Sequence, residues 1–169
     1  FVNLNQTSDL NLSNLFFSNP LTLHNNLIVA STDPYLYILN SRTGNTVSKT
    51  PMTSIVKPIV TKEGIFLITK DNLLVYIDFK SEQVMYSLDI TKEIAAFLDT
   101  KEKTIKIKSF STANNNIIIF LENSYLVKFD MYGKINDISK LPIKMNYLPI
   151  FINDSILYFN KNNKLVILN

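Results

Sequence analysis

A polar residue that closes a strand-like run recurs four times in this chain of 169 residues, and this repeat constrains the fold more than any other feature. The four residues, which we call the anchors, are Asn40, Asp78, Asp130 and Asn169. Successive anchors are 38, 52 and 39 residues apart, and a leucine precedes each anchor by four positions. Repetition at a period of about 40 residues is typical of proteins that copy one structural unit in series.

A proline stands twenty residues before the anchor in three of the four copies, as Pro20, Pro58 and Pro149. The third copy has Phe110 at this position. Because proline has no N–H to donate to a strand ladder, a strand that carries it lies at a sheet edge or begins its pairing there. We therefore expect each of these copies to begin with a short edge strand.

The first three copies then continue through three more strand-like runs, and the fourth copy continues through two, as far as its anchor. An almost wholly apolar run, such as LIVAS, is followed by a turn rich in Asn, Asp or Pro, by an alternating run such as YLYIL, and by a more polar run such as NTVSK. Turn composition of this kind separates short strands. A repeating unit of four short antiparallel strands predicts an all-β fold, a β-propeller of four-stranded antiparallel blades with about four blades in this chain. Such a chain could also be one half of an eight-bladed propeller.

The expected blades cover approximately residues 16–50, 51–90, 104–140 and 141–169. The long third interval leaves residues 90–103 as an insert, for which we expect a short helix with an apolar stripe that includes Phe97, capped by Asp89 or Thr91. This helix would cover the rim of the propeller or contact a partner. Residues 1–15 form an N-terminal segment whose first five residues, FVNLN, could supply the closing strand; otherwise a second copy or a missing N-terminal half would complete the propeller.

The anchors have an expected structural role in the turns that follow them. The side chain of Asn40 or Asp78 can accept hydrogen bonds from the backbone N–H groups of the next turn. In the first copy, Gly44 can supply the positive φ angle that such a turn requires. Asp130, like Asp78, is expected to bond the backbone rather than to take part in chemistry.

Composition excludes several classes of function. The net charge is +3, the lysines are scattered and Arg42 is the single arginine, so a nucleic-acid groove is not expected. The absence of cysteine excludes disulfides, zinc thiolate sites and a thiol nucleophile. His24 is the single histidine, and neither a phosphate-binding glycine loop nor a base beside a nucleophile can be assigned. We therefore assign no catalytic, cofactor-binding or metal-binding residue and expect a protein that is not an enzyme.

The segment NPLTLHNNLIVASTDPYLYILNSRTGNTVSK resembles the PQQ-type propeller repeat, through Pro20, Leu36, Asn40, the Thr43–Gly44 turn and the residues between them. The later copies keep parts of the pattern, so the resemblance extends from Phe17 to Asn169. One branch of this superfamily comprises the quinone-dependent alcohol and sugar dehydrogenases. The chain has no tryptophan for their docking motifs and no acidic cluster for their calcium. A quinone- or ligand-binding propeller remains the alternative function.

The chain is more similar to the C-terminal half of the lipoprotein family of the bacterial outer-membrane β-barrel assembly machinery. This resemblance implies a non-enzymatic scaffold in the periplasm, at the inner face of the outer membrane, whose partners are other proteins such as barrel-assembly components. It also implies a membrane tether outside the visible sequence. Among the aromatic residues, Phe79 and Tyr132 stand at turns, and we expect them to be exposed and to contact partners.

Overall fold

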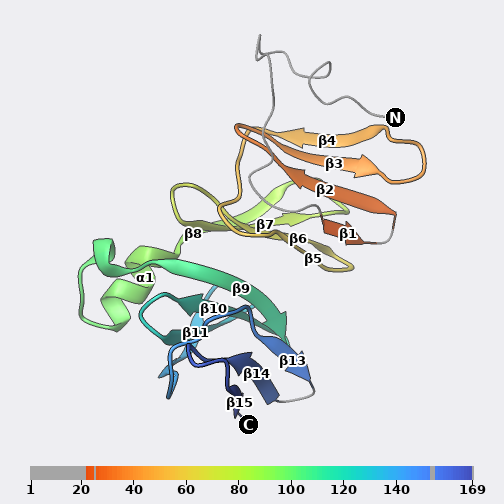
Figure 1. Cartoon of the computed structure of the whole chain (residues 1–169). Helices are drawn as coiled ribbons and strands as arrows, with labels where there is room; N and C mark the ends of the chain where they lie inside the picture. Colours follow the sequence, from red (N-terminus) through yellow and green to blue (C-terminus); the bar gives the residue numbers. More distant parts are fainter. Residues whose placement is uncertain (1–21, 25, 153–154, 169) are drawn as a thin grey trace. The chain divides into compact units, whose positions relative to one another are not determined.

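The computed structural model describes residues 22–24, 26–152 and 155–168, and of residues 22–24 it describes the backbone only. Within these ranges the chain forms four antiparallel sheets and one short α-helix (Figure 1). The expected all-β architecture with one inserted helix is therefore confirmed. The chain divides into two compact units, residues 1–89 and 90–169, and each is described by itself. The segment FVNLN and the positions of Pro20 and Asn169 lie outside the described residues.

The first unit contains two four-stranded sheets in which every neighbouring pair of strands is antiparallel. The first sheet consists, in sequence and spatial order, of β1 (Thr22–His24), β2 (Leu27–Ser31), β3 (Leu36–Asn40) and β4 (Thr46–Thr50). The second consists in the same way of β5 (Ile59–Val60), β6 (Gly64–Ile68), β7 (Leu73–Asp78) and β8 (Val84–Asp89).

The second unit begins with α1 (Ile90–Phe97) and a single 3-10 turn, η1 (Glu102–Thr104). Its first sheet, the third of the chain, consists of β9 (Ile107–Ala113), β10 (Asn116–Leu121), β11 (Tyr125–Asp130) and β12 (Ile135–Lys140). The fourth sheet has three strands in the described part, β13 (Ile150–Ile152), β14 (Ser155–Phe159) and β15 (Leu165–Leu168). The unit thus pairs a four-stranded sheet with a sheet of three described strands.

Proline limits the length of the first strand of a sheet. Strands β5 and β13 begin directly after Pro58 and Pro149, are only two and three residues long, and lie at the edges of their sheets. In the third sheet, Phe110 takes the place of proline, and β9 extends over seven residues with Phe110 paired to Ile119. The difference in length agrees with the missing N–H of proline, which cannot extend the ladder.

A β-bulge recurs at the same repeat position in the first three sheets, a feature that the sequence did not indicate. The register between the third and fourth strands shifts at Ile38/Leu39, at Tyr76/Ile77 and at Lys128/Phe129, directly before each anchor. Because a bulge bends a strand and increases its twist, the outer strand of each sheet is bent at the same distance from its turn.

The anchor side chains close the turns that follow the third strands. Asn40 Oδ1 accepts hydrogen bonds from the backbone N–H groups of Arg42 at 2.9 Å and Thr43 at 3.1 Å, and Gly44 has a φ of 76°. In the third sheet, Asp130 Oδ1 accepts from the N–H groups of Tyr132 and Lys134, both at 2.9 Å. The anchors thus satisfy backbone donors that a tight turn would otherwise leave unpaired.

The second anchor turn contains a non-glycine residue in a left-handed backbone conformation. Asp78 Oδ2 accepts from the N–H of Ser81 at 2.7 Å and from its hydroxyl at 2.9 Å. Glu82, four residues after Asp78 as Gly44 is four after Asn40, has a φ of 58°. A side chain in this left-handed region is disfavoured because its Cβ crowds the backbone.

We therefore expect Glu82→Gly to raise the free energy of unfolding by about 0.5 kcal/mol, since relief of the Cβ contact exceeds the added freedom of the unfolded chain. Urea denaturation of the wild type and the variant measures the change. Glu82→Ala is the control, because it removes the carboxylate but keeps the Cβ, and it should give no gain. Equal stabilisation by both variants would contradict the backbone explanation.

The core of the first unit lies between its two sheets. One face of the first sheet packs on one face of the second, and the buried residues are Val29, Leu36, Ile38, Ile65, Leu67, Val75 and Ile77. Complete burial of an aliphatic side chain of this size contributes roughly 1.5–3 kcal/mol relative to exposure. The alternation of inward and outward residues along β3 and β7 therefore determines which face meets the neighbouring sheet.

The second unit repeats this arrangement between its third and fourth sheets. The buried cluster consists of Ile118, Phe120, Leu126, Leu141, Met145 and Tyr158. The Tyr158 hydroxyl donates a hydrogen bond to the carbonyl of Ile143 at 2.9 Å, so its buried polar atom is satisfied. Desolvation raises the pKa of Tyr158, although this hydrogen bond acts in the opposite direction.

Helix α1 differs from the expected helix in its first residue and in its buried face. It begins at Ile90, so Thr91 lies inside the first turn and cannot be its N-cap, whereas Asp89 directly precedes the helix. Ile94 and Ala95 are buried as expected, but Phe97 is exposed. Phe97 is the last helical residue, and the amphipathic pattern alone does not reveal that the core contact ends before it.

Candidate functional site

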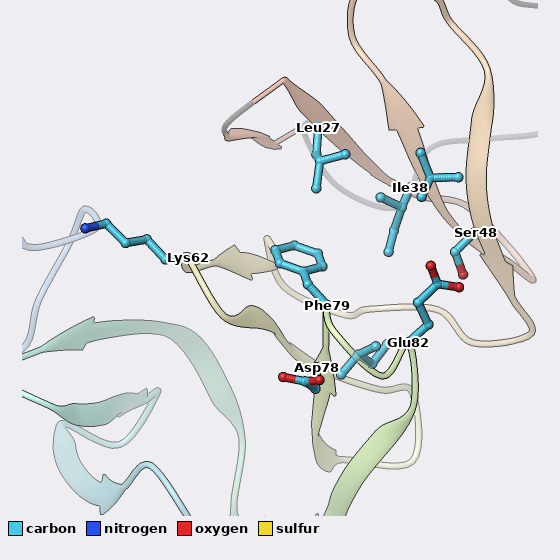
Figure 2. A pocket seen from close by; sticks show the side chains of 9 residues that line it. Leu27, Ile38, Ser48, Lys62, Asp78, Phe79 and Glu82 are labelled. Atoms are coloured by element: carbon cyan, nitrogen blue, oxygen red, sulfur yellow. The ribbon is translucent and has the colours of Figure 1, made fainter.

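An apolar pocket lies between the first and second sheets, at the end where the anchor turns are found. Its volume is about 210 Å³, and the residues that line it are Leu27, Ile38, Val47, Ser48, Lys62, Ile77, Asp78, Phe79 and Glu82. Figure 2 shows the side chains of Leu27 and Ile38 facing the ring of Phe79, with the carboxylates of Asp78 and Glu82 nearby. The pocket is therefore apolar inside and acidic at its edge.

Phe79 occupies this pocket because the chain turns inward directly after the second anchor. Its backbone N–H donates to the carbonyl of Glu63 at 2.8 Å, and its ring packs against the core of the first unit. The ring is thus half-buried, and the expectation of an exposed side chain is wrong for Phe79. A turn position suggested exposure, but the first sheet approaches this turn closely enough to cover part of the ring. A role for Phe79 as a partner contact stays a prediction.

The charge at the edge of the pocket is held by the anchor geometry. The backbone N–H of Ser81, followed by the Ser81 hydroxyl, lowers the pKa of Asp78 below its ordinary value of 3.8, and the backbone N–H and the charge of Lys80 add smaller contributions. Hydrogen bonds to the ionised carboxylate favour that form. Figure 2 shows the Lys62 side chain extending away from the Phe79 ring. The carboxylate of Asp78 is therefore ionised at neutral pH.

The lowered pKa of Asp78 predicts the direction in which the stability of the protein changes with pH. Because the folded-state pKa of Asp78 is lowered, its contribution to stability is present above pH 3.8 and is lost as the pH falls through the lower folded value. Asp78→Asn keeps an acceptor like that of Asn40 but does not titrate. We expect the wild type to lose stability relative to Asp78→Asn between about pH 5 and pH 2.5.

Urea midpoints at both pH values, with an NMR titration of the Asp78 carboxyl, measure this effect. A carboxyl that titrates at or above 3.8 would contradict the role of the Ser81 hydrogen bonds.

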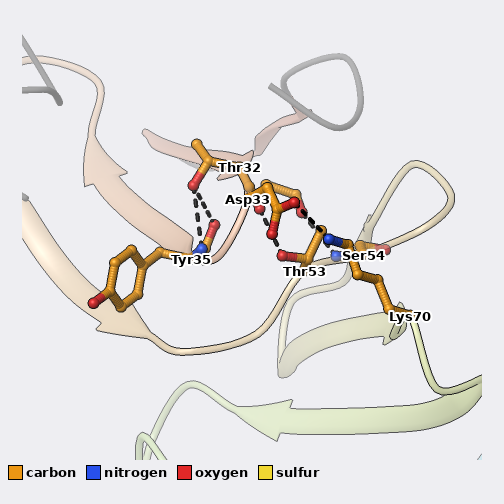
Figure 3. A network of polar contacts seen from close by, with 7 residues as sticks. Thr32, Asp33, Tyr35, Thr53, Ser54 and Lys70 are labelled. Carbon is orange, nitrogen blue, oxygen red and sulfur yellow. Dashed lines mark hydrogen bonds and ion pairs between the residues drawn. The ribbon is translucent and has the colours of Figure 1, made fainter. Parts of the chain in front are cut away.

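Hydroxyl groups join the first two sheets at the opposite end of their strands (Figure 3). The segment after β4 crosses there: the Thr53 hydroxyl donates to the carbonyl of Thr32 at 2.8 Å, and the Ser54 N–H donates to Ser31 Oγ at 2.8 Å. These residues are buried. An exposed ion pair between Lys70 and Asp33, at 2.5 Å, lies beside them. The network fixes the spacing of the two sheets and so supports the pocket between them.

A crossing of the same kind occurs in the second unit, with different chemistry. Lys108 Nζ donates to the carbonyls of Met145 at 2.7 Å and Asn146 at 3.1 Å, and the Asn146 N–H donates to the carbonyl of Phe159 at 2.8 Å. Desolvation, and then the nearby charge of Lys144, lowers the pKa of Lys108, while Glu122 raises it. A lysine thus orders the crossing segment here, where hydroxyls do so in the first unit.

Tyr132 lies in the third anchor turn and is 87% exposed. The expected exposure of this ring is therefore observed. Its backbone N–H donates to Asp130 Oδ1, which holds the residue in the turn and leaves the ring in solvent. A single exposed aromatic residue is common on ordinary surfaces, so its contact with a partner remains a prediction.

Sequence reasoning missed an exposed apolar surface on the fourth sheet. Five large residues on one face of the fourth sheet are between 45% and 61% exposed; they are Ile150, Ile152, Phe159, Leu165 and Ile167. Strand pairing brings them to one face, since Leu157 pairs with both Ile150 and Ile167, and Phe159 pairs with Leu165. We call this surface the outer face. The available signal was that β13–β15 are apolar at almost every position, on both faces.

Chemistry-bearing clusters are not found in the described part of the chain. No three His, Cys, Asp or Glu side chains in the described ranges converge as a metal site would require. No described helix is long and apolar enough to cross a membrane. Of His24 only the backbone is described, as the last residue of β1.

Comparison with known proteins gives similarity in structure and not in sequence. No protein-family model matches the chain, and no curated protein matches it. Among solved structures, BamB from Moraxella catarrhalis matches 90% of the chain at 12% identity with a TM-score of 0.67. BBS1N, solved in complex with ARL6DN, matches 89% at 13% identity with a TM-score of 0.64. The chain has a β-propeller fold.

Lengths differ among these propeller structures. The chain spans 44% of BamB and 50% of BBS1N, which is about half of each protein. It spans 94% of the computationally designed Ika4 protein, at 11% identity and a TM-score of 0.63. At these identities the similarity shows the fold alone, and function must be argued from the surfaces of this chain.

Proposed function

We propose that this chain is a non-enzymatic protein-interaction scaffold, and the apolar pocket beside Phe79 is the observation that supports this function. Partner binding commonly uses an apolar anchor that enters a pocket surrounded by polar groups. The pocket offers Leu27, Ile38 and Phe79 inside, with Asp78 and Glu82 at its edge. It therefore fits an apolar side chain that is flanked by a basic residue on a partner protein.

The size of this pocket favours a protein side chain over a cofactor as its occupant. Sites for small molecules and cofactors usually have volumes of about 300–1,000 Å³. The pocket beside Phe79, at about 210 Å³, is smaller than this range. A single large side chain is a better match than a quinone, so the pocket favours a protein partner over the quinone-binding alternative.

Within this scaffold role we propose assembly of outer-membrane proteins as the process, and the periplasmic side of the outer membrane as the location. The resemblance of the repeat pattern to that of the barrel-assembly lipoprotein family supports this proposal. The similarity in fold to BamB agrees with it, at the level of architecture. Both the process and the location are inferences from resemblance. Identification of a crosslinked partner protein tests the process directly.

Site-specific photo-crosslinking tests the function in intact cells. A photoreactive amino acid replaces Val47, which lines the pocket, and a matched control replaces Glu93, an exposed residue of α1. We expect the Val47 position to crosslink a barrel-assembly component, and we expect Phe79→Ala to reduce this product by about tenfold. Equal products from both positions, or a yield unchanged by Phe79→Ala, would contradict the assignment of this pocket.

A further inference from the structure

A second pocket lies between the third and fourth sheets, and all of its lining residues belong to the second unit. Its volume is about 240 Å³, and its aliphatic lining residues are Leu126, Leu141, Ile156 and Leu168. Lys128 also lines it and precedes its anchor by two residues, as Ile38 of the pocket beside Phe79 does. Leu168 directly precedes its anchor, as Ile77 of that pocket does. The repeat therefore places a pocket at the same sheet–sheet contact in both units, and we call the one in the second unit the lysine pocket.

The residue two positions before the anchor differs in charge between the two pockets. Ile38 belongs to the buried core of the first unit. Lys128 lies on the core-facing side of the third sheet, because it pairs with the buried Ile118 and is two residues from the buried Leu126. Lys128 is half-buried. Because desolvation disfavours an unpaired charge, a lysine beside an apolar core normally has an anionic partner.

The described residues do not supply an anion for Lys128. Within the described ranges, no carboxylate forms an ion pair with its ammonium group. Asp137 is its cross-strand partner in β12, but the Asp137 side chain is exposed and does not line the lysine pocket. The pocket thus has a cation that is available to a ligand.

The other polar residues of the pocket are Ser139 and Lys140. Ser139 pairs with Leu126, which places it on the same face as Lys128, and its hydroxyl has no hydrogen-bond partner among the residues that the structure describes. Lys140 pairs with Tyr125 on the opposite face, and its ammonium lies 5.9 Å from the centroid of the Tyr125 ring. Lys128 and Ser139 are therefore the two polar groups on the core-facing side.

We propose that the lysine pocket binds an apolar side chain that stands next to a carboxylate on a protein partner. The carboxylate pairs with Lys128 and accepts a hydrogen bond from the Ser139 hydroxyl, and the apolar side chain contacts the aliphatic lining residues. The pocket is smaller than the usual range of about 300–1,000 Å³ for small-molecule sites, which favours a side chain as its occupant.

The charge preference of the lysine pocket is opposite to that of the pocket beside Phe79. Asp78 and Glu82 at the edge of the first pocket favour a basic group, whereas Lys128 in the second favours an acidic one. Since Ile38 and Lys128 stand at the same repeat position, a single residue in each repeat sets the charge of its pocket. Lys128 is therefore the specificity-determining residue of the second pocket.

This inference rests on the proposed scaffold role and adds a second binding site to it. Its test uses the purified full chain and measures signals of the second unit, whereas the crosslinking experiment measures partner capture at Val47 in the first unit. Failure of either experiment is therefore distinguishable from failure of the other.

N-acetyl-leucine and N-acetyl-leucinamide are matched probes, because they share an apolar side chain and differ in the carboxylate. In an NMR titration of the isotope-labelled chain, N-acetyl-leucine should shift the backbone amide signals of β11, β12 and β15 with a Kd of about 1 to 10 mM. N-acetyl-leucinamide should bind at least about tenfold more weakly, since it does not form the charged pair. Equal affinities, or no saturable shift of these signals up to about 50 mM, would overturn the proposal.

Variants assign the preference to Lys128. Lys128→Ile, which introduces the residue found at the equivalent position of the first unit, should weaken N-acetyl-leucine about tenfold and leave the affinity for N-acetyl-leucinamide nearly unchanged. Lys128→Gln should act in the same way with a side chain that stays polar. Lys103→Ile is the matched control, because it removes the same charge from an exposed residue of η1, and it should keep the preference. A preference for the carboxylate that survives in both Lys128 variants, or that is lost equally in Lys103→Ile, would overturn the proposal.

Discussion

Replacement of Gly64 by alanine is expected to lower the free energy of unfolding by about 3 kcal/mol, because the added methyl group overlaps the backbone of the neighbouring strand. Gly64 begins β6 and pairs with Asp78. A Cβ at this position would overlap the carbonyl oxygen of Ile77 and lie 2.6 Å from a ring atom of Tyr76. Tyr76 cannot easily move away, since its ring stacks on Phe66 with the centroids 4.5 Å apart.

Urea denaturation monitored by circular dichroism and tyrosine fluorescence measures this loss, since the chain has no tryptophan. Asn116→Ala is the matched control, because Asn116 begins β10 and pairs with the third anchor as Gly64 pairs with the second. Its side-chain hydrogen bonds are exposed, so we expect a change below about 1 kcal/mol. A loss in Gly64→Ala no larger than this would refute the close approach at Gly64.

Phe120→Ala is expected to have the largest effect, a loss of about 4 kcal/mol, because it removes a fully buried ring from the core of the second unit. The ring lies between the third and fourth sheets, with its centroid 6.2 Å from that of Phe151. Tyr158 belongs to the same cluster, and its position is held by a backbone hydrogen bond. The surrounding strands therefore have little freedom to fill the cavity.

The control for this variant is Phe97→Ala, the same substitution at an exposed residue of the same unit. We expect it to change the free energy of unfolding by less than about 0.5 kcal/mol. The two variants should also differ in hydrogen exchange, with protection lost in β10, β11 and β14 only in Phe120→Ala. Similar costs for both variants would mean that the third and fourth sheets do not share a packed core in solution.

The anchors show how far local sequence chemistry extends. An Asn or Asp that closes a strand predicts a turn because its side chain reaches the next backbone N–H groups, and Asn40, Asp78 and Asp130 all make such bonds. Glu82 shows the limit of this reasoning. Its left-handed backbone is imposed by the turn around it, and the residue type alone gives no sign of that conformation.

The exposure of the candidate partner-binding residues could not be predicted from the neighbouring sequence. Phe79 and Tyr132 both follow an anchor, yet one ring is half-buried over a core and the other is almost fully exposed. The first sheet lies beside the turn of Phe79, whereas Tyr132 has solvent around it. Sequence position therefore could not separate the two residues, because the neighbour that covers Phe79 is about 40 residues away along the chain.

The sequence by itself determined the repeat, the order of the strands, the edge position of the proline-bearing strands and the turn chemistry of the anchors. These properties depend on hydrogen-bonding groups and side-chain alternation within a few residues of each other. Only the tertiary structure decided which apolar face is covered, that Gly64 has no room for a side chain, and that Leu165 is in solvent while Leu36 and Leu126 are buried. The physical reason is that burial is created by the face of another sheet, whose distance and register a linear pattern does not specify.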